Sequence, residues 1–165
     1  MGKAKVIIQA TILTIAAVGQ ILLAFLLYDK EGNETIINTG WVVLWISAIF
    51  GWLPFFTLKK WGAVPKGKSY VSTTKLVDRG VYAIVRHPQY LAGILIGVAL
   101  PLISQHWAVA VLGGIVVIVN YIDTFDEEKS SIEKFGDDYR QYMTRVPRVN
   151  FILGIFRLTA GKLGT

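Results

Sequence analysis

The 165-residue chain contains no cysteine, only two histidines and few charged side chains. Without cysteine, disulfide bonds, thiolate zinc sites, iron–sulfur clusters and cysteine nucleophiles are all excluded. Charged residues make up 17% of the sequence, compared with about 25% in an ordinary soluble domain, while 53% is hydrophobic. This composition argues against a soluble enzyme, a disordered tail and a small secreted protein, and it indicates a membrane protein.

Four long stretches lack charged side chains, and we expect each of them to form a membrane-spanning helix. They are residues 6–28, 35–58, 88–103 and 107–122. The first two have 23 and 24 residues, enough as helix to cross a hydrocarbon core of about 30 Å. The last two have 16 residues each, about 24 Å of helix, so they are marginal unless the helices continue beyond the apolar stretch. Because only residues 104–106 separate these two, they are predicted to form a tight helical hairpin.

Lys and Arg are distributed unevenly between these stretches. Sixteen of the 17 lie before residue 6, between residues 59 and 86, or after residue 123, and only Lys30 lies elsewhere. By the positive-inside rule, this distribution predicts a multi-pass protein with both termini cytoplasmic. The net charge of +6 is then a topology signal and an attraction to anionic headgroups, and nucleic acid is not an expected partner.

The expected fold class is therefore an all-α integral membrane protein with about four transmembrane helices and a cytosolic amphipathic helical cap. We expect residues 1–165 to form a single domain. Its parts are two N-terminal spans (1–58), a cytoplasmic loop (59–87), the helical hairpin (88–122) and a cytosolic cap and tail (123–165). Gly93 and Gly97, together with Gly113 and Gly114, give the hairpin a small-residue face that permits close helix packing or a dimer without requiring one.

The first polar element of interest is Arg86-His87, directly before Pro88. Proline is favoured at the first helical position, so a helix is predicted to start at Pro88 with His87 at its N-cap. Free backbone N–H groups, the helix dipole and a guanidinium together suit a carboxylate or phosphate. Alternatively, Arg86 only reaches toward lipid headgroups and His87 only caps the helix.

The second polar element follows the fourth apolar stretch. It contains Asp123, Asp126, Glu127 and Glu128, which are either a solvated acidic face or a group with a functional partner. Five apolar or aromatic residues then recur at helical spacing, with a stop and restart expected at Gly136-Asp137: Ile132, Phe135, Tyr139, Tyr142 and Met143. No pair of histidines has metal-ligand spacing, so no metal site is expected. Residues 151–165 alternate apolar and basic positions and are predicted to lie along the membrane surface.

The two polar elements form an ordered pattern. It reads Gly80-x-Tyr82-x-x-Val85-Arg86-His87-Pro88-x-Tyr90, then Glu127-Glu128, then Phe135-Gly136-x-x-Tyr139-x-x-Tyr142 and Val146-Pro147-Arg148. Over residues 76–148 this pattern resembles the integral-membrane methyltransferases of the isoprenylcysteine carboxyl methyltransferase and phospholipid methyltransferase group. The resemblance implies an all-helical membrane bundle, S-adenosylmethionine as methyl donor, S-adenosylhomocysteine as product, and a cofactor site on the cytoplasmic side.

The resemblance also implies the site residues. Arg86, His87 and Glu128 are the expected catalytic residues. The expected cofactor-binding residues are Tyr82, Arg86, His87, Pro88, Tyr90, Glu127, Glu128, Tyr139 and Arg145. We hypothesise that Arg86 and the helix start hold the anionic end of the cofactor, while the two glutamates accept hydrogen bonds from its amino or ribose groups. In one departure, the chain has Ala92 where the family commonly has glycine, and Gly93 follows one position later.

The methyl acceptor is expected to be a lipophilic molecule that arrives laterally from the bilayer lipids. The pattern is most like an isoprenylcysteine carboxyl O-methyltransferase, and the alternative is a phospholipid amine N-methyltransferase. A carboxylate is already a nucleophile at neutral pH, whereas an ammonium must first lose a proton to a group such as Glu or His. A nicotinamide-dependent sterol reductase and a membrane scaffold without enzyme activity are the more distant alternatives.

Overall fold

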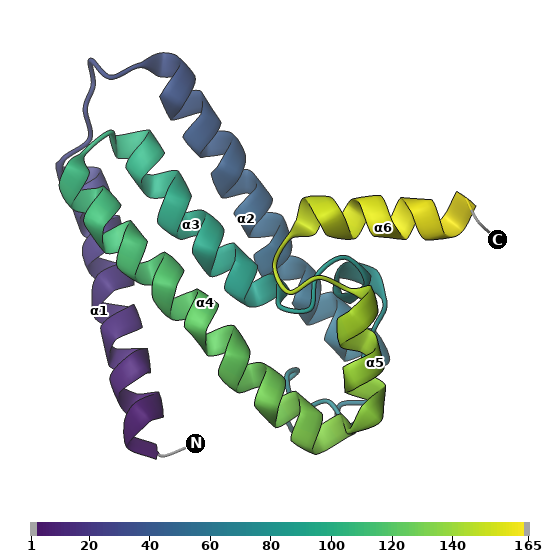
Figure 1. Ribbon diagram of the computed structural model, residues 1–165. Coiled ribbons are helices and arrows are strands. Elements are labelled where there is room, and N and C mark those ends of the chain that lie inside the picture. The colour runs from purple at the N-terminus through teal and green to yellow at the C-terminus, as the bar shows by residue number, and fades with distance from the viewer. Residues whose placement is uncertain (1–2, 164–165) are drawn as a thin grey trace. The chain divides into compact units, whose positions relative to one another are not determined.

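The computed structural model describes residues 3–163, with side chains placed for residues 4–160. Its elements are α1 (Lys3–Leu26), α2 (Glu34–Trp61), the 3-10 helix η1 (Gly80–Ala83), α3 (Pro88–Ser104), α4 (Trp107–Phe135), α5 (Asp137–Arg145) and α6 (Phe151–Leu163) (Figure 1). No β-strand occurs within residues 3–163. The prediction of an all-α chain is confirmed for this range.

Three of the four predicted spans form helices that are long and apolar enough to cross a membrane. These are α1, α2 and α4, with 24, 28 and 29 residues. The fourth, α3, is equally apolar but has 17 residues, about 26 Å, which is shorter than a hydrocarbon core of about 30 Å. The predicted cytoplasmic chain ends fall on terminal residues that lie outside the described range.

The ends of α4 follow the sequence signals closely. The helix does not stop at Ile122, where the apolar stretch ends, but continues to Phe135, which was one of two possibilities for a stretch of marginal length. Asp123 to Glu128 therefore lie on the same helix as the apolar stretch. Gly136 has a φ of 58°, a left-handed conformation that favours glycine, and α5 begins at Asp137. The predicted stop and restart is confirmed.

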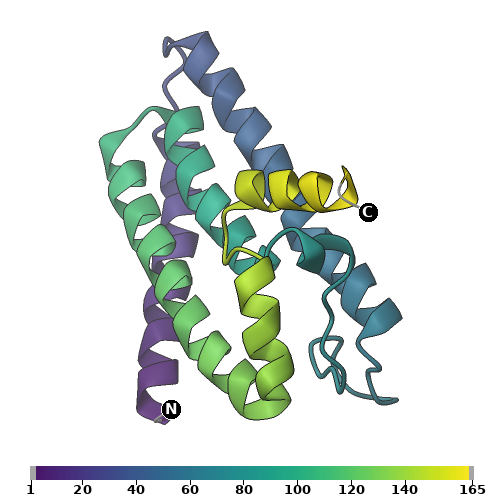
Figure 2. The same cartoon turned by 45° about the vertical axis from the view of Figure 1, so that its right-hand side comes forward.

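The chain divides into two compact units, with boundaries at 49/50, 89/90 and 123/124. The first unit contains α1, the first part of α2, most of α3 and the first part of α4. In this unit α1, α3 and α4 lie side by side (Figures 1 and 2). The predicted hairpin is confirmed, because only Gln105 and His106 separate α3 from α4. Gln105 also exchanges two hydrogen bonds with the backbone of Asn33, of 3.1 and 2.9 Å, which join the two loops.

Glycine allows α3 and α4 to approach closely within the first unit. A Cβ atom added at Gly97 would lie 2.9 Å from the Gly113 carbonyl oxygen, and one added at Gly113 would overlap the Gly97 carbonyl oxygen. Gly93 packs against the side chain of Asn120, whereas Gly114 faces open space. The predicted glycine face therefore packs through Gly93, Gly97 and Gly113, and Gly114 takes no part in it.

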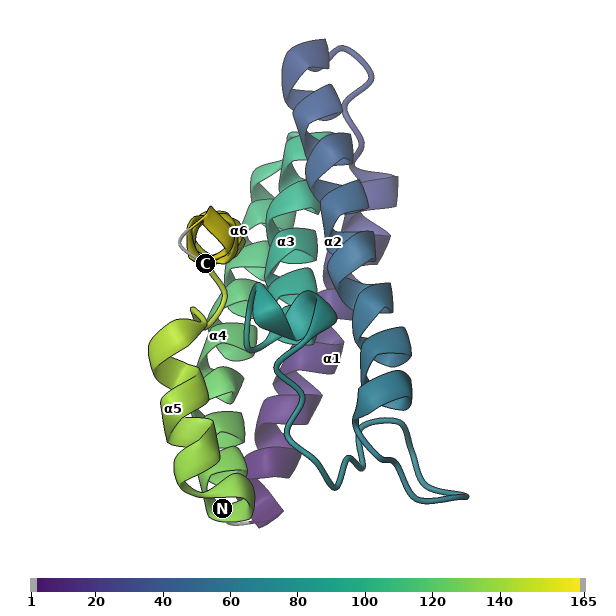
Figure 3. The same ribbon diagram turned by 90° about the vertical axis from the view of Figure 1, so that its right-hand side faces the viewer.

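The second unit contains the remaining parts of α2 and α4 together with η1, α5 and α6 (Figure 3). Its aromatic core is formed by Tyr139, Tyr142 and Val146, against which further side chains pack: Leu76, Ile132, Phe135 and Met143. All five residues predicted from the helical spacing are in this group. The amphipathic helical cap is therefore confirmed as a packed structure.

Candidate active site

The loop that follows η1 and the loop that follows α5 lie side by side in the second unit. The backbone N–H of Arg86 donates to the carbonyl of Pro147 (3.0 Å), and that of His87 donates to the carbonyl of Arg148 (3.2 Å). α3 then begins at Pro88, as predicted, and Pro88 is fully buried. These backbone hydrogen bonds fix the positions from which Arg86, His87 and Arg148 project.

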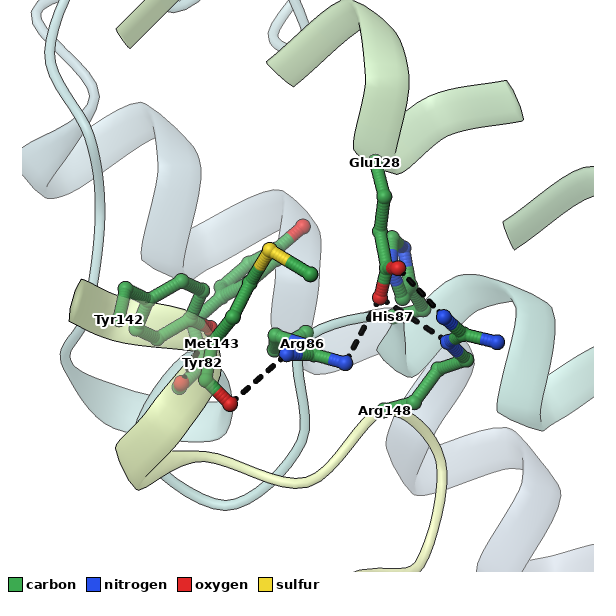
Figure 4. Close-up of polar contacts among 7 residues, drawn as sticks. All are labelled: Tyr82, Arg86, His87, Glu128, Tyr142, Met143 and Arg148. Carbon is green, nitrogen blue, oxygen red and sulfur yellow. Dashed lines mark hydrogen bonds and ion pairs between the residues drawn. The ribbon is translucent and has the colours of Figure 1, made fainter. Parts of the chain in front are cut away.

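The side chain of Glu128 is the centre of a charged cluster (Figure 4). Arg86 Nη2 lies 2.8 Å from Glu128 Oε1 and His87 Nε2 lies 3.3 Å from the same oxygen. Arg148 binds both carboxylate oxygens through one edge of its guanidinium, with Nε 3.0 Å from Oε1 and Nη2 2.5 Å from Oε2. We call Arg86, His87, Glu128 and Arg148 the charged cluster.

The charged cluster is largely shielded from solvent. The side chains of Glu128 and Arg86 are 6% and 8% exposed, and that of Arg148 is 21% exposed. Bidentate pairing with Arg148 and the Arg86 contact compensate for the desolvation of the carboxylate. The Arg148 guanidinium also lies 3.8 Å from the centre of the Phe125 ring, a cation–π contact. With two guanidinium groups and one carboxylate, the cluster carries a surplus of positive charge.

Arg86 has a second set of contacts on the side of α5. Its Nη1 donates to the carbonyl oxygen of Met143 (2.9 Å), so the guanidinium bridges α4 and α5. Its Nε, which is also a donor, is buried and has no hydrogen-bond partner among the described residues. A buried donor without a partner is unfavourable by about 1–3 kcal/mol, so this N–H is available to an acceptor that the chain itself does not supply.

Three tyrosines near the charged cluster, Tyr82, Tyr139 and Tyr142, are largely buried and contribute to packing. The hydroxyl of Tyr142 donates to the carbonyl of Tyr82 (2.6 Å), which ties α5 to η1. Burial raises the pKa of Tyr139 to about 12 and raises the pKa values of Tyr82 and Tyr142 well above the usual range. All three phenols therefore stay protonated at neutral pH and do not act as bases.

The structure brings together the three residues that the sequence nominated as catalytic, Arg86, His87 and Glu128. Our hypothesis assigned Arg86 and Glu128 to separate groups of the cofactor. In the structure the two side chains instead form an ion pair with each other. Glu127, on the neighbouring position of α4, is exposed. Tyr139 lies in the aromatic core and Tyr82 accepts through its backbone, while Tyr90 belongs to the first unit.

Arg145, which we expected to bind the cofactor, is not part of the charged cluster, whereas Arg148 is. Arg145 is 65% exposed and lies 3.7 Å from Asp78, whereas Arg148 binds Glu128. Both arginines were visible in the sequence, three positions apart. Pro147 indicates only that the helix ends before Arg148, as α5 does at Arg145, while the contact of Arg148 with Glu128 on α4 is a long-range feature.

Among the described residues, no group of three or more His, Asp or Glu side chains is arranged to hold a metal ion.

The family model of the phospholipid methyltransferases matches residues 35–138, more than half of the chain. This range includes Arg86, His87 and Glu128 but not Arg148. No curated protein matches the chain.

Proposed function

Because the chain belongs to the phospholipid methyltransferase family, we propose that it transfers a methyl group from S-adenosylmethionine to a lipophilic acceptor in the bilayer. The observation that supports this proposal most strongly is the charged cluster with its surplus positive charge and the buried, unpartnered Nε of Arg86. We further propose that the two units act as one catalytic domain.

The donor set of the cluster fits the functional groups of the cofactor. Arg86 Nε would donate to the carboxylate of its methionine part, and Arg148, one fifth exposed, would add a second cationic contact. The exposed carboxylate of Glu127 would accept hydrogen bonds from its amino or ribose hydroxyl groups. For Glu128 we propose a role as a positioning residue that holds the two arginines in place, in addition to the cofactor contact expected from the sequence.

The bound cofactor supplies an electrophilic methyl group. The protein then has to orient the acceptor and exclude water, and such positioning contributes up to about 7–11 kcal/mol to lowering a barrier. Arg86 and Arg148 are suited to positioning because Glu128 and the Met143 carbonyl fix their guanidinium planes. His87, 4% exposed, closes the side of the cluster where α3 begins.

The family match favours a phospholipid amine as the acceptor, which would then be N-methylated. The motif pattern, by contrast, is most like that of the carboxyl O-methyltransferases, so a carboxylate is the second candidate acceptor. An ammonium acceptor must first give a proton to a base. Glu127 is the carboxylate available for that step, since Glu128 is engaged by three side chains and the buried tyrosines are protonated.

We place the cofactor site on the cytoplasmic side of a multi-pass protein with four spans, of which α3 is the shortest. The distribution of Lys and Arg supports this orientation. In it, the charged cluster lies just beyond the apolar part of α4, within reach of an aqueous cofactor and of lipid headgroups.

The acceptor is identified by its product. Purified protein in vesicles that contain phosphatidylethanolamine should incorporate label from methyl-labelled S-adenosylmethionine into an N-methylated headgroup, from which mild base releases no labelled methanol. A prenylated cysteine acceptor would instead give a base-labile methyl ester. Glu133→Gln, an exposed change on α4, is the control and should retain activity. Absence of label in both acceptors, with protein that remains folded, would contradict the proposed function.

A further inference from the structure

The C-terminal helix α6 carries its apolar side chains on the outside. Ile152 and Phe156 are 70% and 68% exposed, and Ile155 and Leu153 are also exposed. Of residues 151–160, only Gly154 is buried. On a helical wheel Gly154 lies opposite the arc formed by the four exposed side chains. In a water-soluble protein the apolar face of a surface helix turns inward, so the arrangement of α6 is inverted.

Several contacts within the second unit fix α6 in this orientation. A Cβ atom at Gly154 would overlap the carbonyl oxygen of Ile84, so at this point the backbone of α6 lies directly on the segment before Arg86. The ring centres of Phe151 and Phe50 are 5.4 Å apart, which joins the start of α6 to α2. The Asn150 side chain accepts a hydrogen bond from the N–H of Leu153 (3.0 Å) and caps the helix. The helix therefore cannot rotate its apolar arc inward without breaking these contacts.

Exposing that arc to water would be unfavourable. Removing a large aliphatic or aromatic side chain from water is favourable, and α6 leaves four such side chains outside. A contiguous exposed apolar surface of this kind marks contact with another apolar phase.

The arrangement and charge of α6 indicate which phase this is. Within the second unit, α6 runs across α2 and not alongside it: Figure 3 shows α6 from its end while α2 extends along its length. A helix that crosses a candidate membrane span lies closer to the membrane plane than to the membrane normal.

Two further observations fit a lipid environment. Trp52 and Phe56 of α2, in the same unit, are large apolar side chains that are 69% and 58% exposed. From Phe151 onward the sequence contains no acidic residue, which suits an anionic leaflet.

We propose that α6 is an in-plane membrane helix that inserts Ile152, Ile155 and Phe156 into the interfacial layer of a bilayer with anionic lipids. Such helices bury their apolar face about 5–10 Å below the headgroups. Because Gly154 lies on Ile84, two positions before Arg86, the inserted helix fixes the depth of the charged cluster relative to the lipid surface. This role does not depend on the reaction that the site performs.

The absence of cysteine makes a direct test possible, since each introduced cysteine carries a single spin label. Ile152→Cys and Phe156→Cys should be compared in vesicles of phosphatidylcholine and phosphatidylglycerol with two exposed controls, Ile15→Cys on α1 and Lys66→Cys in the loop before η1. The collision rates of each label with oxygen and with a water-soluble nickel chelate are measured by electron paramagnetic resonance.

For the α6 labels and for Ile15→Cys, we expect the collision rate with oxygen to exceed the collision rate with the nickel chelate. For Lys66→Cys we expect the collision rate with the nickel chelate to be the higher of the two. Collisions of the α6 labels with nickel at the level of Lys66→Cys would place α6 in water. Low collision rates with both reagents would mean that protein, such as a second copy of the chain, covers the helix. Either of these two results overturns the proposal.

Discussion

Replacing Glu128 by glutamine should destabilise the protein by about 3 kcal/mol, at the lower end of the range for breaking a buried ion pair. The substitution keeps the shape of the side chain but removes the only negative charge of the charged cluster. Arg86, 8% exposed, would then be left as a buried cation without a counterion, while Arg148 at 21% exposure can recover part of its hydration. The measurement is the thermal midpoint of the purified protein in detergent.

Glu133→Gln is the matched control, because Glu133 is an exposed glutamate on the same helix. An exposed substitution of this kind changes stability by no more than about 0.5 kcal/mol. Equal midpoints for the two variants would show that the charged cluster contributes no net stability, and our electrostatic account of it would then be wrong.

The second large effect is expected at the contact between α3 and α4. Gly113→Ala should destabilise the first unit by about 1–3 kcal/mol, since the new methyl group meets the Gly97 carbonyl, a backbone atom that cannot turn aside. The same methyl group would lie 2.6 Å from Gln20 Nε2, which donates to that carbonyl (3.0 Å). The helices must therefore separate, and this hydrogen bond is lost as well.

The adjacent glycine provides an internal control for this prediction. Gly114→Ala introduces the same methyl group into open space and replaces glycine by a better helix former, worth up to about 1 kcal/mol. The midpoint of Gly114→Ala should therefore equal or exceed that of the unmodified protein, while that of Gly113→Ala should fall. If both variants behave alike, the close approach of α3 and α4 at this point is not correct.

Much of the helical pattern was predictable because its signals are local. Pro88 specified the start of α3, and Gly136 specified the break between α4 and α5. The length of α4 beyond Ile122 was only a possibility in the sequence, because the absence of charge defines a lipid-facing stretch and not the end of a helix. Pro54 and Pro101 lie inside α2 and α3, within the two stretches predicted as helices, although proline disfavours a helix interior locally.

The candidate site was predictable as a set of motifs but not as a geometry. Arg86, His87 and Glu128 meet in space, as their shared motif pattern implied. The choice of Arg148 over Arg145 depends on how the segment after α5 packs against α4, a long-range contact. Likewise, the alternation of apolar and basic residues after position 150 indicated a surface helix, but only the packing of Gly154 on Ile84 shows which side faces outward.

Calorimetric titration of the purified full-length protein in detergent with S-adenosylhomocysteine tests the central claim most directly, with NADPH as the control ligand. We predict saturable binding of S-adenosylhomocysteine and none of NADPH. Binding should be lost in Glu128→Gln, measured below its thermal midpoint so that the variant remains folded, because Arg86 and Arg148 would no longer be held in place. No binding of S-adenosylhomocysteine by folded unmodified protein, or binding of NADPH instead, would contradict the account.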